Sequence, residues 1–206
     1  MIESNIVFED LFIIPLVSVM VREDTSELED DNIKTVFYGK SEHPNRDYRV
    51  LENYPNTKNI LLKYIRSSLK KLGYRCEFDI STSWCTEIKK GGNSNLHKHK
   101  NSWFSAVYYY GDYDENVGKF YILNPLNNLT SFLSDVNGYN KFTKEKTFID
   151  PKKKHMIIFP SYLEHGISHH QSYLPRYSLA MNIIPTGNYG NYDSAYNTSW
   201  YEESKK

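Results

Sequence analysis

The sequence predicts a mainly β protein, a sandwich or barrel of short strands supported by at least one helix. Three observations predict this class. From Arg75 onward, short runs of alternating character are separated by Gly, Asn, Asp and Pro turns. Tyrosine, which suits half-buried strands, occurs 18 times. Residues 57–72 repeat apolar side chains at helical spacing, so an amphipathic helix precedes the strands.

The N-terminal region supplies the supporting elements. Residues 6–22 are expected to form a strand, which the Ile14-Pro15 step interrupts. The helix over 57–72 is expected to begin at an N-cap, Asn56 or Thr57, and to end at Gly73. The apolar side chains expected to pack on the outside of a sheet are Leu61, Ile65, Leu69 and Leu72.

The strands follow in order after the helix. They are expected near 75–80, 83–89, 103–110, 118–123, 147–149, 154–159 and 176–184. Residues 124–146 are rich in Asn, Ser and Lys and are expected to form a long insertion, of the kind that serves as a lid or binding loop. The chain is expected to be one domain, with support in 1–74, the core in 75–186 and a Tyr/Asn-rich tail in 187–206.

The bulk composition excludes several classes. At 206 residues, with 25 basic and 25 acidic side chains, the chain carries no net charge that would attract nucleic acid, although a local basic groove is left open. The apolar run 11–21 is too short to span a bilayer, so a cytoplasmic protein is expected, in a host cell if a phage encodes it. Cys76 and Cys85 are expected to be reduced thiols in neighbouring strands.

Three histidines and one arginine are the candidate site. His97 and His99 stand at i and i+2, which places both imidazoles on one face if they lie on a strand. His165 follows an apolar strand and a turn, and is expected at a strand edge. Three nitrogen ligands leave open positions on a mid-first-row metal, and Arg176 offers paired donors to a carboxylate. His155, His43 and the pair His169-His170 are given no role in the site.

Alternation along 176–184 separates a polar face from an apolar one. Arg176, Ser178, Ala180 and Asn182 share the face expected to line the pocket, whereas Tyr177, Leu179, Met181 and Ile183 share the face expected under the helix. In the alternating run 103–110, Tyr109 shares a face with Val107 and Ser105, and Tyr108 and Tyr110 lie on the opposite face. One of these tyrosines is expected to donate its phenol to a co-substrate, and Tyr108 and Tyr110 are the candidates.

Four blocks together resemble a known family. HKHKNSWFSAVYY, GKFYILNP, IIFPSYLEHGISHH and PRYSLAMNII look like the 2-oxoglutarate/Fe(II) dioxygenases, in particular the bacterial and phage 2OG-Fe(II) oxygenase branch related to prolyl hydroxylases. The resemblance covers about residues 80–186. It implies a double-stranded β-helix (jelly roll, cupin-like) with one or more N-terminal helices packed on a sheet. It also implies iron ligands at His97, His99 and His165, and 2-oxoglutarate bound by Arg176 with Ser178 and Asn182 nearby.

One departure from this family is clear in the first block. Most members have His-x-Asp or His-x-Glu, whereas this chain has His99 at the third position, so the ligand set has no obvious carboxylate. Asp112 or Asp114 folding into the site, or another metal, are left open as alternatives.

The function expected from the sequence is iron-dependent oxidative decarboxylation of 2-oxoglutarate coupled to hydroxylation of an unidentified substrate, with no catalytic residue beyond the ligands. The alternative is a non-catalytic jelly roll that binds a metal or ligand, such as a phage accessory protein. Nucleic acid is not indicated as a partner, and self-association through the tail is left open.

Overall fold

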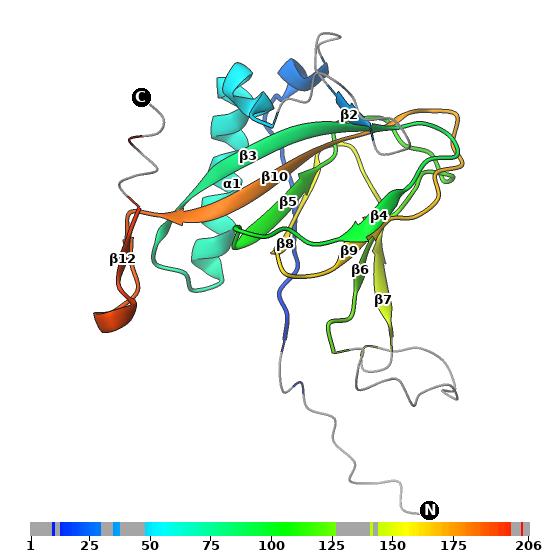
Figure 1. Ribbon diagram of the computed structural model, residues 1–206. Helices are drawn as coiled ribbons and strands as arrows, with labels where there is room; N and C mark the ends of the chain where they lie inside the picture. Colours follow the sequence, from blue (N-terminus) through cyan, green and yellow to red (C-terminus); the bar gives the residue numbers. More distant parts are fainter. Residues whose placement is uncertain are drawn as a thin grey trace, which may run out of the picture.

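The computed structural model describes residues 10, 13–29, 35–37, 48–126, 141, 144–198 and 203, with the backbone alone for 35–37. Two largely antiparallel sheets face each other as a sandwich, and one helix covers the outer face of the larger sheet (Figure 1). The predicted mainly β class with a supporting helix is confirmed. In the described part of the chain, no helix is both long and apolar enough to cross a bilayer.

The larger sheet has six strands. Their spatial order is β1 (Val17–Met20), β8 (His155–Pro160), β5 (Phe104–Tyr108), β10 (Arg176–Thr186), β3 (Glu77–Ile88) and β2 (Thr35–Phe37). The smaller sheet runs β4 (Ser94–His97), β9 (His165–Ile167), β6 (Phe120–Leu123) and β7 (Lys146–Ile149). A hairpin of β11 (Asn188–Tyr189) and β12 (Tyr196–Asn197) extends from the end of β10, and one-turn helices occupy Ser26–Glu29, Val50–Asn53 and Tyr192–Ser194.

Several predicted strand boundaries are corrected by this pairing. The runs 75–80 and 83–89 form the single strand β3, in which a register shift opposite Asn182 and Ile183 leaves Ser81 as an extra residue. Cys76 therefore precedes the strand that carries Cys85, and neither cysteine forms a disulfide. Of the predicted strand over 6–22, the structure describes residues 10 and 13–22, and within these only β1 is a strand. β4 and β9 have four and three residues, too short for a period-2 pattern to reveal.

Helix α1 (Pro55–Lys71) begins earlier than predicted, and its cap comes from elsewhere in the chain. Neither Asn56 nor Thr57 is the N-cap. Instead the Glu27 carboxylate accepts hydrogen bonds from the Thr57 amide (3.0 Å) and hydroxyl (2.8 Å), and from the Asn56 side chain (2.9 Å). An acidic group at a helix N-terminus satisfies free amides and is favoured by the helix dipole.

The predicted stop at Gly73 is confirmed. Gly73 has a φ of +97°, its amide bonds to the Lys70 carbonyl, and the Tyr74 amide bonds to the Leu69 carbonyl. This is the Schellman closure that a residue without a Cβ permits. Leu72 sits at the C-cap and is 41% exposed, so it does not belong to the buried face as expected.

Two apolar clusters lie on the two sides of the larger sheet. The helix-side cluster joins Leu61, Ile65 and Leu69 of α1 to side chains of β3, β5 and β10. The inter-sheet cluster includes Val107, Phe120, Phe159 and Ile167 and lies between the two sheets. The candidate site borders this second cluster. His43, residues 127–140 of the expected insertion and the end of the tail lie outside the described residues.

Candidate metal and carboxylate site

The three predicted histidines meet between the sheets. His97 ends β4, His165 begins β9, and the two residues are paired directly across these antiparallel strands. One ligand atom from each of His97, His99 and His165 lies within 4.8 Å of the others. Ring centroids are 4.4 Å apart for His97 and His165 and 5.1 Å for His99 and His165. Such a group has the size and donor set of a metal site.

His99 reaches the cluster differently from the way the spacing suggested. β4 ends at His97, so His99 lies in the turn that follows rather than on the strand. The His99 amide donates to the Ser161 carbonyl (3.1 Å), and this bond ties the turn to the end of β8. The Ser161 hydroxyl bonds in turn to the hydroxyls of Ser105 and Ser102, each at 2.9 Å. A buried hydroxyl network thus fixes the third histidine.

Hydrogen bonds orient two of the imidazoles. Nδ1 of His97 lies 2.8 Å from the Asn95 carbonyl, and Nδ1 of His165 lies 2.9 Å from the Leu163 carbonyl. A carbonyl can only accept, so each Nδ1 carries a proton and each Nε2 presents its lone pair. These are the tautomers that a metal ligand requires.

Burial keeps His99 and His165 neutral. Burial, with a smaller contribution from the neighbouring His97, lowers the pKa of His165 to about 3 and that of His99 to about 4. Phe159 and Phe120 pack on His165 with centroids at 4.9 and 5.4 Å. Because metal binding needs a deprotonated imidazole, the site is prepared for an ion at neutral pH.

Arg176 lies at the start of β10 in the same pocket and is completely buried. Its Nε donates to the Gly118 carbonyl (2.9 Å) and its Nη1 to the Ser178 hydroxyl (3.0 Å), whereas Nη2 has no partner among the described residues. No carboxylate in the described ranges forms an ion pair with it. A buried guanidinium that keeps a free donor is costly unless an anion binds it.

Hydroxyl groups and a glycine shape this end of the pocket. The Ser178 and Thr86 hydroxyls are 2.6 Å apart, and both residues line the pocket with Arg176. A Cβ on residue 118 would lie 2.7 Å from the Ser168 carbonyl oxygen. Only glycine therefore lets the segment before β6 pass this close to the backbone of Ser168. The Gly118 amide donates to Nδ1 of His170, a fully buried histidine whose Nε2 bonds to the Leu174 carbonyl. His170, which received no role from the sequence, supports the segment that holds Arg176.

The prediction that Tyr108 or Tyr110 contacts a co-substrate does not agree with the positions of their side chains. Tyr108 and Tyr110 belong to the helix-side cluster, and the Tyr108 hydroxyl bonds to Thr25 (2.7 Å). Tyr109 lies on the site side instead. The Arg176 guanidinium carbon is 5.3 Å from its ring centroid, its hydroxyl has no described partner, and burial raises its pKa to about 12. The alternation that grouped Tyr109 with Val107 and Ser105 was the signal that could have found it.

Asn182 and the two aspartates also differ from expectation. Asn182 lies farther along β10, where its amide donates to Thr82 (2.9 Å) and its carbonyl accepts from Ser105 (3.3 Å), and it does not line the pocket with Arg176. Asp112 lies 3.3 Å from Lys153, and Asp114 accepts from Ser172 at 2.6 Å. Within the described residues, no carboxylate joins the three histidines.

Side chains that the sequence did not single out complete the pocket. Trp84 of β3 packs on His99 with ring centroids 5.5 Å apart, and Phe120 and Phe159 enclose His165. His155, expected on the surface or in a satisfied core position, is buried and bonds to the Ser18 hydroxyl at 2.6 Å. The pocket therefore has a buried guanidinium at one end and three histidines that could hold a metal ion at the other, with aromatic rings packed around the histidines.

Comparisons with known proteins agree with this arrangement. The chain is similar to an oxidoreductase of the 2OG-Fe(II) oxygenase family from Burkholderia pseudomallei, with 14% identity and a TM-score of 0.54 over 82% of this chain and 84% of that chain. It is also similar to HygX from Streptomyces hygroscopicus, crystallised with nickel, 2-oxoglutarate and hygromycin B, with 12% identity and a TM-score of 0.55 over 84% of each chain. At these identities the matches show the fold, the double-stranded β-helix.

No curated protein is significantly similar in sequence. Neither the family match nor the similar structures support the expected phage origin. Residues 82–182 match the family described as "Putative 2OG-Fe(II) oxygenase", and this segment contains the three histidines and Arg176. On that match, the segment 82–182 belongs to the 2OG-Fe(II) oxygenase family.

Proposed function

We propose that the protein is an Fe(II)- and 2-oxoglutarate-dependent dioxygenase that hydroxylates its substrate. One observation carries the proposal: the buried Arg176 guanidinium keeps an Nη2 without a hydrogen-bond partner among the described residues, in the same pocket as three clustered imidazoles. A structural metal site has no use for a buried cation with a free donor beside it. A site for an anionic, metal-chelating co-substrate needs both.

The metal would be held by His97, His99 and His165. Neutral nitrogen donors suit mid-first-row divalent ions, and three of them leave positions open for other ligands. A bound Fe(II) would supply the dioxygen chemistry that couples oxidative decarboxylation of 2-oxoglutarate to hydroxylation of a C–H bond. Since no carboxylate among the described residues joins the three histidines, we expect weaker metal binding than in sites with a carboxylate.

The co-substrate would be oriented by Arg176. Its free Nη2 and the hydroxyls of Ser178 and Thr86 offer donors to the carboxylate that is distal to the metal. That carboxylate would neutralise a charge that the fold leaves uncompensated. HygX, which has the same fold, has been crystallised with both a metal and 2-oxoglutarate.

The aromatic walls would exclude water from the reacting end. Phe120, Phe159 and Trp84 surround the histidines, and an apolar lining strengthens electrostatic contacts inside the pocket. The identity of the primary substrate does not follow from this lining.

The test is release of labelled carbon dioxide from 2-oxoglutarate with Fe(II) and dioxygen, measured with and without candidate substrates. We expect release by the wild type, and none above background by His99→Ala. His169→Ala, which removes an exposed histidine close to His165 in sequence, is the matched control and should match the wild type.

The alternative is a jelly roll that binds a metal or ligand without turnover, and the missing carboxylate ligand is what favours it. It would be supported if the wild type bound Fe(II) stoichiometrically but released no carbon dioxide, with and without candidate substrates. Loss of release in both His99→Ala and the His169→Ala control would indicate unfolding rather than loss of a ligand.

A further inference from the structure

Positive charge gathers around the second half of α1 and the turn into β3. Between residues 63 and 78 there is one carboxylate, Glu77, and there are five basic side chains: Lys63, which lies 3.7 Å from Glu23, and Arg66, Lys70, Lys71 and Arg75. The whole chain is balanced at 25 basic and 25 acidic residues, so this segment is a local excess. The zero net charge of the chain did not exclude a local basic groove of this kind.

Part of this charge borders a groove. A hollow of about 480 Å³ is lined by Arg66, Lys70, Arg75 and Tyr74, with Glu77 as its one acidic residue. Arg66 lies 3.8 Å from Glu77 and donates to the Phe78 carbonyl. Lys70 and Arg75 are exposed and form no ion pair with the described residues. The Gly73 and Tyr74 amides satisfy the carbonyls of Lys70 and Leu69 near the end of α1.

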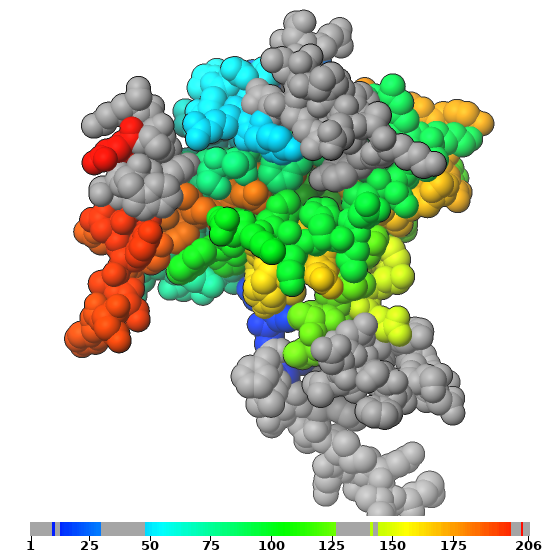
Figure 2. Space-filling model, in the orientation of Figure 1, coloured from blue at the N-terminus to red at the C-terminus, as the bar shows by residue number. Residues whose placement is uncertain are grey.

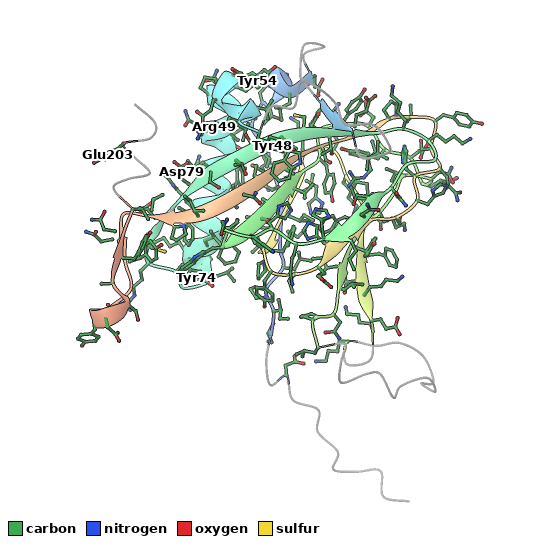
Figure 3. All side chains as sticks on the ribbon, in the orientation of Figure 1. Tyr48, Arg49, Tyr54, Tyr74, Asp79 and Glu203 are labelled. Atoms are coloured by element: carbon green, nitrogen blue, oxygen red, sulfur yellow. The ribbon has the colours of Figure 1, made fainter. Side chains whose placement is uncertain are left out.

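A row of aromatic side chains leads away from the groove. Tyr74 contacts Trp103 with ring centroids 6.4 Å apart, Trp103 contacts Tyr189 at 5.5 Å, and Tyr189 contacts Tyr196 at 5.6 Å. Tyr74, Trp103 and Tyr196 are 37–52% exposed, so each ring keeps surface that a ligand could contact. Figure 3 labels Tyr74 at the end of α1 that lies toward the β11–β12 hairpin.

These side chains form one surface. Figure 2 shows the hairpin (orange to red), the start of β5 (green) and the turn after α1 (teal) next to one another on the visible face. We call it the basic–aromatic surface, defined by Lys70, Tyr74, Arg75, Trp103, Tyr189 and Tyr196. None of these residues lines the pocket of the candidate site. The Ser161 amide donates to the Trp103 carbonyl, and the Ser161 carbonyl accepts from the His99 amide, so the surface is linked to the site through Ser161.

We propose that the basic–aromatic surface binds single-stranded nucleic acid. Cations that track a phosphate backbone, combined with aromatic rings on which bases stack, are the features that such binding requires. A duplex hides the faces of its bases, and an acidic polypeptide would use the cations but not the rings. Charge and aromatic row together therefore favour a single strand over either alternative.

The test is fluorescence anisotropy with labelled 20-nucleotide oligo-dT, titrated with the full chain at several salt concentrations. With two or three phosphate contacts, the logarithm of the binding constant should fall with log salt at a slope of about −1.4 to −2. Lys70→Ala with Arg75→Ala should weaken binding about 10-fold or more and reduce the slope by about 1.4. Tyr196→Ala should weaken it at least about fivefold with the slope unchanged.

The matched control is Lys90→Ala with Tyr173→Ala. These residues form an exposed cation–π pair, with Nζ 3.3 Å from the ring, in loops at the other end of β3. The control should bind oligo-dT as the wild type does. Absence of binding at 50 mM salt, equal binding by the Lys70/Arg75 variant, or tighter binding of a duplex of equal length would overturn the proposal. So would displacement by polyglutamate together with unchanged binding by Tyr196→Ala, because charge alone would then explain binding.

Discussion

The two faces of β10 carry opposite kinds of side chain. On the helix side, Leu179, Met181 and Ile183 are fully buried in the apolar cluster under α1. On the pocket side, Arg176 and Ser178 are just as buried but polar, and the guanidinium keeps an unpaired donor. One face contributes to stability through apolar burial, and the other holds an uncompensated charge that only a ligand relieves. Within the eleven residues of β10, one face therefore stabilises the fold, and the other carries the side chains that we expect to bind a ligand.

The largest effect is expected on the pocket face. Arg176→Met should weaken 2-oxoglutarate binding by about 1000-fold, because two charge-assisted hydrogen bonds, at about 1.5–3 kcal/mol each, are lost. The free energy of unfolding should stay the same or rise, because an unpaired buried charge is removed. Calorimetric titration of the metal-loaded protein and urea unfolding measure the two quantities. Affinity retained within threefold would mean that Arg176 does not bind the co-substrate.

The opposite face should give the opposite result. Leu179→Ala should lower the free energy of unfolding by about 2–5 kcal/mol, because it leaves a cavity under α1. Below the unfolding transition, its affinity for 2-oxoglutarate should stay close to that of the wild type. Urea unfolding and calorimetry on this variant measure its stability and its affinity for 2-oxoglutarate. A parallel fall in both would contradict the separation of roles between the two faces of β10.

The histidines should make the metal-free protein sensitive to acid. In the unfolded chain they take up protons near pH 6.5, whereas burial holds the folded-state pKa values near 3 for His165 and 4 for His99. Between pH 6.5 and about 4 the unfolded state therefore binds more protons, and stability falls as the pH falls. Urea midpoints at pH 7.5 and 5.0 should differ less for His165→Asn than for the wild type. The control His169→Ala should keep the wild-type difference, and an unchanged difference in His165→Asn would contradict the account.

The smallest effect is expected at the cap of α1, which supports the apolar face from outside. Glu27→Ala should lower the free energy of unfolding by about 1 kcal/mol, because the Thr57 amide loses its acceptor. Glu29→Ala is the matched control: it removes an exposed ion pair to Lys153, which should matter by less than about 0.5 kcal/mol. Thermal unfolding of both variants measures the difference, and equal losses would mean that the Glu27 contact is an ordinary surface pair.

The sequence predicted what local patterns encode. Alternation along β10 placed Arg176 and Ser178 on the pocket face and Leu179 on the other, and helical spacing with Gly73 placed the helix and its end. The meeting of the three histidines was predicted from their residue types and from the family resemblance. These features depend on neighbouring residues, or on a set of blocks that occurs together.

What the sequence did not reveal depends on contacts between distant segments. The Glu27 carboxylate caps a helix that begins 28 residues later, which no capping pattern encodes. The position of His99 in a turn depends on the Ser161 carbonyl, and the choice of Tyr109 over Tyr108 depends on which face of β5 meets the smaller sheet. The basic–aromatic surface joins a helix end, a strand start and a hairpin that are far apart in the chain.

The central claim is that three neutral histidines and Arg176 together hold iron and 2-oxoglutarate. The most direct test is anaerobic titration of the Fe(II)-loaded protein with 2-oxoglutarate, in which the chelate gives a weak visible charge-transfer band. The account predicts a saturable band for the wild type, no band for His99→Ala, and a band only at much higher 2-oxoglutarate for Arg176→Met. Stoichiometric iron without a band, or an unchanged band in His99→Ala, would contradict it.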